Sequence, residues 1–195
     1  MQRPIGYVSS SSGGNVFGYV SGTTTATPVA PIYPTNFESI ATINVGSGGS
    51  SSETFVSIPS TYKHLQLRWI SRSNGGNYNP IIRFNGDSGN NYSWHYLDGN
   101  GASVTSGGAA STSSILIAGI GNTANTFSVG IMDILDYTDT NKFKTVKILQ
   151  GVDYNGSGAA DLWSGNWQST SAITSMYLGF FSTQYSQFAL YGIKG

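Results

Sequence analysis

The residue types that most often carry catalysis are scarce in this sequence. His64 and His95 are its only histidines, and it has no cysteine. A zinc site needs clustered histidine, cysteine or carboxylate ligands, and a nucleophile elbow needs a Gly-x-Ser-x-Gly motif between a strand and a helix. The sequence has neither pattern. We therefore expect no catalytic residue, no cofactor and no metal site, and we expect that the chain is not an enzyme.

Carboxylates are the next candidates, because paired acids are the usual route to glycoside hydrolysis. One acidic cluster is present, and its last two members fall in a predicted turn, where aspartate forms local hydrogen bonds. Oxygen ligands in that cluster, or in a second polar loop, would suit calcium. Neither segment has the ligand spacing of a known calcium loop, so ordinary turn chemistry is favoured for both. The residues concerned are Asp133, Asp136 and Asp139 in the cluster, and Asn85, Asp87, Asn90 and Asn91 in the loop.

Aromatic side chains are the remaining groups that could bind a partner. Trp94, Trp163 and Trp167 fall near predicted loops. Exposed rings there could stack on sugars, or they could fill a subunit interface, where tryptophan and tyrosine are enriched. An interface is favoured over a glycan site for Trp163 and Trp167. Trp69 alternates with leucines in its segment, so it is expected in the core.

These candidates lie in a chain whose pattern predicts many short β-strands. Apolar and polar residues alternate through 64–69, for example, as in a strand with one buried face. The dipeptide Asn85-Gly86 predicts a hairpin turn, and the Gly/Ala/Ser-rich stretch 103–112 is expected to be a loop. No helical pattern alternates with the strands, which disfavours a parallel α/β sheet. We expect an all-β fold for residues 37–195, an antiparallel β-sandwich of jelly-roll type, with a closed barrel as the alternative.

Composition agrees with that fold and limits the partners. Charged residues make up 9% of the sequence and the formal net charge is zero, whereas an average soluble domain is roughly 25% charged. Without a basic stripe, nucleic-acid binding is not expected.

No apolar run approaches the roughly 18 residues that span a bilayer, so no membrane partner is expected. No apolar stretch follows the first residues as in a signal peptide, so synthesis in a cytoplasm is expected. A surface of low charge suits a protein covered by neighbours in an assembly.

Residues 1–36 are predicted to be an extended arm that precedes the sandwich domain. Arg3 is the only charged residue before Glu38, and glycine, serine, threonine and proline dominate. Such a segment cannot bury enough apolar area to offset its backbone entropy. A Gly-Tyr-Val-Ser sequence occurs twice in it, and isolated apolar residues of this kind could dock onto a partner. The expected partner-binding residues of the arm are Tyr7, Val8, Phe17, Tyr19, Val20 and Tyr33. A disordered tail is the alternative.

Several segments of the domain resemble a module found in tailed-bacteriophage virion structural proteins. They are residues 37–42, the loop 46–52 and residues 55–68, of sequence FVSIPSTYKHLQLR, while residues 188–193 look like the module's closing strand. The resemblance covers about residues 37–195. It implies a β-sandwich virion protein that has no catalytic residues and forms homo-oligomers, of which a trimer is one form.

Two roles are compatible with this resemblance. In the first, the protein decorates or cements the capsid and is attached through its N-terminal arm. In the alternative, it is a tail-fibre or receptor-binding tip protein that recognises host surface glycans near the three candidate tryptophans. Either role implies other virion proteins as partners, capsid or tail subunits, and a location in the virion after synthesis in the host bacterial cytoplasm. A glycan depolymerase is disfavoured, because histidine and glutamate are so few.

Overall fold

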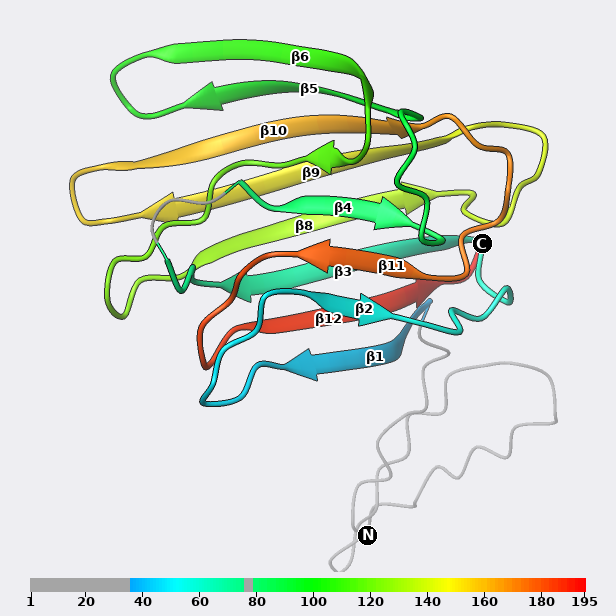
Figure 1. Ribbon diagram of the computed structural model, residues 1–195, viewed down its shortest axis with the longest axis horizontal. Coiled ribbons are helices and arrows are strands. Elements are labelled where there is room, and N and C mark those ends of the chain that lie inside the picture. The colour runs from blue at the N-terminus through cyan, green and yellow to red at the C-terminus, as the bar shows by residue number, and fades with distance from the viewer. Residues whose placement is uncertain (1–35, 76–78) are drawn as a thin grey trace, which may run out of the picture. The chain divides into compact units, whose positions relative to one another are not determined.

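The structure, a computed structural model, describes residues 36–75 and 79–195, and every regular element in these residues is a β-strand (Figure 1). The larger sheet contains β1 (Phe37–Asn44), β3 (His64–Ser71), β5 (Tyr92–Gly99), β6 (Val104–Thr112), β8 (Ser128–Leu135), β9 (Lys144–Asp153), β10 (Gly158–Trp167) and β12 (Gln187–Ile193). The smaller sheet contains β2 (Glu53–Phe55), β4 (Ile81–Phe84), β7 (Ile115–Leu116) and β11 (Met176–Gly179). The spatial orders are β1-β12-β3-β8-β9-β10-β5-β6 and β2-β11-β4-β7, and all paired strands are antiparallel.

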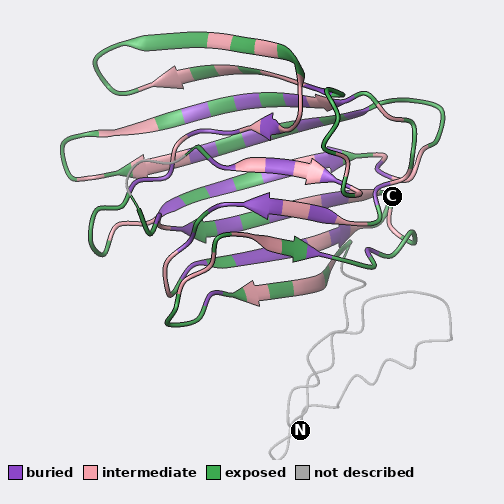
Figure 2. Cartoon of the chain, viewed as in Figure 1, coloured by how far each residue is buried: buried purple, intermediate pink, exposed green. Residues whose placement is uncertain are grey.

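The core lies between these two sheets. Leu65, Leu67 and Trp69 point inward from β3, and Ile82 of β4 and Leu178 of β11 meet them from the smaller sheet. Along β3, β8, β9 and most of β10, buried residues alternate with more exposed ones, as period-two strands require (Figure 2). Full burial of one such side chain stabilises the fold by about 1.5–3 kcal/mol. The prediction that Trp69 lies in the core is confirmed.

One buried lysine closes an end of this core. Lys144, the first residue of β9, is almost wholly buried. Its Nζ donates to the backbone carbonyl oxygens of Asp139, Lys142 and Thr170. Burial lowers the pKa of Lys144, because the charged ammonium is removed from water. The lysine therefore joins the turn between β8 and β9 to the segment that follows β10.

The prediction of an all-β, antiparallel β-sandwich is confirmed, but two local predictions are wrong. Residues 103–112 are not a loop, because β6 pairs along its length with β5. The Asn85-Gly86 turn is present, with φ angles of 54° and 70°. It is not a hairpin turn, because the strands on either side of it, β4 and β5, belong to different sheets. The narrower assignment to a jelly roll stays a prediction.

The N-terminal arm lies outside the described residues, except for Asn36. Its predicted partner-binding residues, Tyr7, Val8, Phe17, Tyr19, Val20 and Tyr33, therefore stay predictions, as does the boundary between residues 36 and 37. The compact unit that contains the described residues begins at Thr35 and extends to Gly195. In the following, the inner face of the larger sheet is the face toward the smaller sheet, and the outer face is the opposite one.

Candidate functional site

The candidate tryptophans lie on the inner face of the larger sheet. Trp163 is 6% exposed and Trp167 is 2% exposed, while Trp94 is half-buried. The ring centroids of Trp163 and Trp94 are 5.5 Å apart, and those of Trp163 and Tyr96 are 4.7 Å apart. The expectation that Trp163 and Trp167 offer exposed rings is therefore wrong. The alternation along β10 directs both rings inward, where they pack against other aromatic side chains.

The predicted acidic cluster forms ion pairs with lysines at one end of the larger sheet. The pairs are Asp136 with Lys63 and Lys142, Asp139 with Lys142, and Asp133 with Lys147. Hydrogen bonds from Lys142 and then Lys63 lower the pKa of Asp136 to about 2. Each carboxylate therefore has a cationic partner already. This arrangement supports the interpretation of the cluster as turn and surface chemistry.

The second polar loop is likewise used for local hydrogen bonding. Asp87 accepts hydrogen bonds from Nε1 of Trp167 at 2.7 Å and from Nδ2 of Asn91 at 3.0 Å. These contacts, Trp167 first, lower the pKa of Asp87. Oδ1 of Asn85 accepts the backbone N–H of Thr174 at 2.8 Å. The loop between β4 and β5 is thus bound to the segment that connects β10 and β11.

The two histidines are on different strands and in different surroundings. Nδ1 of His64 accepts the backbone N–H of Asp136 at 3.0 Å, whereas His95 is exposed on the outer face. Within residues 36–75 and 79–195, no group of three or more His, Cys, Asp or Glu side chains is arranged to hold a metal ion.

The outer face of the larger sheet carries an exposed aliphatic row that we name the leucine row. It consists of Ile131, Leu149, Leu162 and Leu97, which are 40%, 58%, 46% and 50% exposed. These residues come from β8, β9, β10 and β5, four neighbouring strands. Each is the direct cross-strand partner of the next. Directly opposed side chains on one face lie about 5 Å apart, so the row is a continuous apolar ridge.

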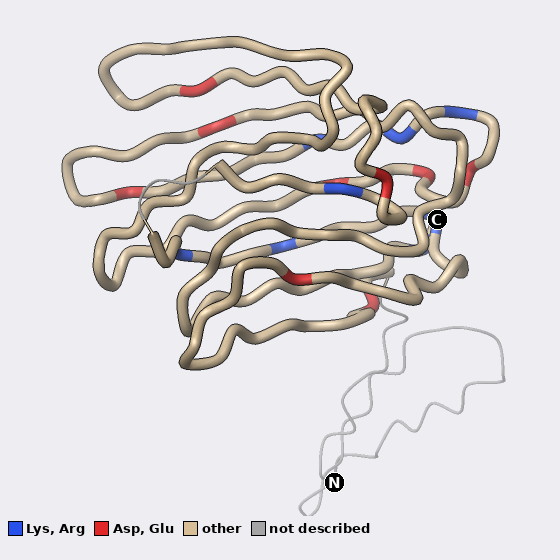
Figure 3. Tube along the Cα trace, in the orientation of Figure 1, with Lys and Arg blue, Asp and Glu red and all other residues tan. Residues whose placement is uncertain are grey.

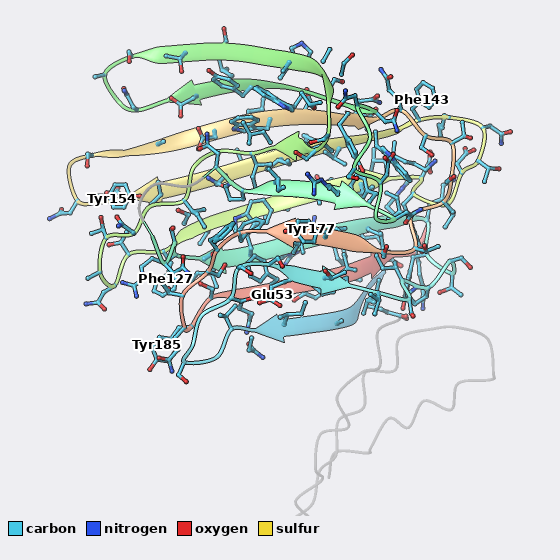
Figure 4. The ribbon with its side chains drawn as sticks, viewed as in Figure 1. Glu53, Phe127, Phe143, Tyr154, Tyr177 and Tyr185 are labelled. Atoms are coloured by element: carbon cyan, nitrogen blue, oxygen red, sulfur yellow. The ribbon has the colours of Figure 1, made fainter. Side chains whose placement is uncertain are left out.

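A shallow hollow lies beside the leucine row, toward the β9–β10 turn. Its floor is a row of small residues, Gly151, Ala160 and Gly99, which are also paired across β9, β10 and β5. Val129 and Phe127 line one side, and the volume is about 700 Å³. Phe127 projects from that end of the sheet, as Figure 4 shows. Because the floor residues have almost no side chains, the hollow runs parallel to the ridge.

A polar row borders the leucine row on its other side. It has one residue from each of five neighbouring strands, and each residue is paired with the next. In the order β3, β8, β9, β10 and β5, they are Gln66, Asp133, Lys147, Ser164 and His95. Nε2 of Gln66 donates to Asp133 at 2.8 Å, and Lys147 lies 3.1 Å from the same carboxylate. The charges of this row are therefore paired with each other. The leucine row and the small-residue row themselves contain no charged residue.

Sequence reasoning did not find the leucine row. The available signal was one pair of adjacent apolar residues in β9, since Ile148 points inward and Leu149 points outward. Adjacent apolar residues in a strand place an apolar side chain on each face of the sheet.

Comparison with known proteins yields no relative for this chain: no family model, no curated protein and no solved structure matches it. The described part of the chain contains no helix of the length and hydropathy needed to cross a membrane.

Proposed function

We propose that this protein is a non-enzymatic structural subunit of a tailed-phage virion, which associates with copies of itself through the leucine row. The observation that carries the self-association is the row itself, four aliphatic side chains in register and 40–58% exposed on one sheet face. Burial of apolar surface stabilises association by roughly 25 cal/mol per Å². A contiguous exposed apolar patch on a soluble protein is typical of an interaction site.

A second copy is the occupant that this surface suits best. A ridge and a parallel hollow lie side by side, two residues apart along each strand, which is about 7 Å. A two-fold axis that lies in the interface, parallel to the two rows and midway between them, would bring the ridge of each copy onto the hollow of the other, as an isologous interface requires. The two rows carry no charge, so the burial of their own side chains leaves no ion without a partner. Asp153, a charged residue that lines the hollow, lies at the end of β9. The paired charges of the polar row would lie at the rim.

The virion role rests on the phage-module resemblance of residues 37–195, together with the low charge of the chain. The role we propose within the virion is decoration or cementing of the capsid. Attachment would use residues 1–36, nearly all outside the described residues. The tail-fibre alternative needs an exposed glycan platform, and the inward orientation of Trp163 and Trp167 gives it no support.

Oligomerisation can be tested with matched pairs of lysine substitutions. Leu149→Lys with Leu162→Lys places two charges on the ridge. Thr145→Lys with Asn166→Lys places two charges on the same strands, at residues that are also directly paired on the outer face. We expect wild type and the control pair to elute as oligomers in light-scattering chromatography, and the ridge pair to elute as a 20.6 kDa monomer. Equal behaviour of the two pairs, or a monomeric wild type, would contradict the proposal.

Attachment to particles can be tested by removing residues 1–36. We expect the truncated protein to fold, because the remaining residues make up the compact unit, and we expect it to be missing from assembled particles. Full incorporation of the truncated protein would contradict the attachment role. The ridge pair of substitutions serves as the comparison, since it should weaken self-association without removing the arm.

A further inference from the structure

A buried acid on the inner face of the larger sheet has no basic partner. Asp161 of β10 is 3% exposed. Its direct cross-strand partner on β5 is Asp98, another acid. Figure 3 shows one acidic segment on each of these neighbouring strands, with no basic segment beside them. Every ion pair among the described residues involves Glu38, Asp133, Asp136 or Asp139, and none involves Asp98 or Asp161. Two carboxyl groups are therefore held together without a protein cation.

An amide on the next strand completes a row of oxygen atoms. Gln150 of β9 is the cross-strand partner of Asp161 on its other side and is 3% exposed. Its Nε2 donates to the carbonyl oxygens of Ala118 and Gly119 at 3.2 and 3.3 Å. This directs Oε1 away from that loop. Oε1 of Gln150 and Oδ1 of Asp161 are both buried and both lack a hydrogen-bond partner.

A shared proton does not account for this arrangement. Burial, and then the hydrogen bond with Asp98, raise the pKa of Asp161 to about 7, so the pair could hold one proton. That proton would bridge one contact between the two carboxyl groups. The buried oxygens of Asp161 and Gln150 would still lack a partner, and buried polar atoms without partners are rare in native proteins.

We propose that Asp98, Asp161 and Gln150 form a calcium site on the inner face of the larger sheet. Calcium takes carboxylate and amide oxygens at 2.3–2.6 Å in flexible geometry, and directly opposed side chains are about 5 Å apart. One ion between β10 and β5 can therefore contact both carboxylates, and the longer side chain of Gln150 extends toward it from β9. Asp98 is partly exposed, so water can complete the coordination from that side. Thr105 of β6 is the partner of Asp98 on the far side, and its hydroxyl donates to Asp98 Oδ1 at 3.4 Å.

Bound calcium would connect β9, β10 and β5 and so secure the edge hairpin β5–β6. A competing donor is the indole N–H of Trp163, which also lacks a partner and lies on the same face as Asp161. If that group simply donates to Asp161, the protein will not respond to calcium. The two explanations are therefore separated by adding calcium alone to the full chain.

Thermal unfolding with added CaCl₂ tests the site. For wild type, we expect the Tm to rise by about 5–10 °C at a hundredfold excess of calcium over its Kd. Asp161→Asn should abolish this rise. Asp153→Asn is the matched control, because Asp153 is exposed at the end of β9 and accepts only the local Asn155 N–H. It should respond as wild type does. Terbium, a calcium substitute, should show luminescence sensitised by Trp163 in wild type and in the control variant only.

Three results would overturn the proposal. The first is a wild-type Tm that calcium does not change. The second is an equal calcium response in Asp161→Asn and Asp153→Asn, which would indicate nonspecific charge screening. The third is terbium luminescence that persists in Asp161→Asn. Loss of folding is not expected in Asp161→Asn, since the substitution removes a buried charge and keeps the side-chain shape. Gln150→Leu offers a second variant, which should weaken calcium binding while both carboxylates remain.

Discussion

Two regions of the larger sheet differ in which face carries the apolar side chains. One region is β3 and β8, and the other is in β9, β10 and β5. In β3 and β8, Leu67 and Met132 are buried on the inner face, while Gln66 and Asp133 are hydrogen-bonded to each other on the outer face. This is the usual arrangement of a half-exposed antiparallel sheet.

At one cross-strand row of β9, β10 and β5 the arrangement is reversed. The inner face carries Gln150, Asp161 and Asp98, and the residues next to them in sequence, Leu149, Leu162 and Leu97, form the exposed outer row. An exposed leucine beside a buried aspartate is unfavourable on both faces in an isolated domain. Our two proposals account for this row by a second copy on the outer face and a cation on the inner face.

The largest effect on stability is expected in β3 and β8, where the inner face is apolar. Leu67→Ala removes a fully buried side chain between the two sheets. The lost burial and the cavity left behind should lower the free energy of unfolding by about 2–5 kcal/mol. Urea unfolding followed by tryptophan fluorescence measures this directly. A loss below about 1 kcal/mol would show that the core relaxes to fill the cavity.

Substitution of a buried polar group should lower stability where the group has hydrogen-bond partners, but not where it lacks them. Lys144→Met leaves three backbone carbonyl oxygens without their donor, and this should lower the free energy of unfolding by about 1–3 kcal/mol. Asp161→Asn, measured without calcium, should leave stability unchanged or increase it. Equal destabilisation by both substitutions would mean that Asp161 is already satisfied within the chain.

Stability without calcium should depend on pH in opposite ways at two acids. The pKa of Asp161 is raised to about 7 by burial first and then by Asp98, so the folded state binds its proton more tightly than the unfolded state. Its contribution to stability is present below the unfolded pKa of about 3.9 and is lost as pH rises through about 7. The pKa of Asp136 is lowered to about 2 by Lys142 and Lys63. Its contribution is present above the unfolded pKa and is lost as pH falls through about 2.

Thermal melts across this pH range check both acids. In Asp161→Asn, the loss of stability toward neutral pH should disappear, while the loss at acidic pH should remain. If the decline toward neutral pH persists in that variant, another group causes it and the reversed inner face is not the source.

The strands of the two regions could be predicted from the sequence to different extents. Residues 64–69 alternate cleanly, and β3 (His64–Ser71) matches that prediction. β6 was missed because its glycine, alanine and serine residues have low strand propensity, and it forms only through pairing with β5. The two faces of β10 could not be assigned, because Leu162 and Trp163 are both apolar. Only the register with β9 and β5 decides which of them is buried.

The smallest effect should come from the leucine row in the monomer. Leu162→Ala changes an exposed side chain, so the free energy of unfolding of a monomeric form should change by less than about 0.5 kcal/mol. This is best measured in the Leu149→Lys background, where we expect association to be weakened. A loss comparable to that of Leu67→Ala would mean that Leu162 is covered within the chain.

Sedimentation equilibrium of the full-length protein over a wide range of concentration tests the central claim most directly. If the reversed region of the sheet is an interface between copies, the fitted mass will rise with concentration to a multiple of 20.6 kDa. The Leu149→Lys, Leu162→Lys protein will remain at 20.6 kDa throughout. A wild-type mass that stays at 20.6 kDa at every concentration would contradict the account.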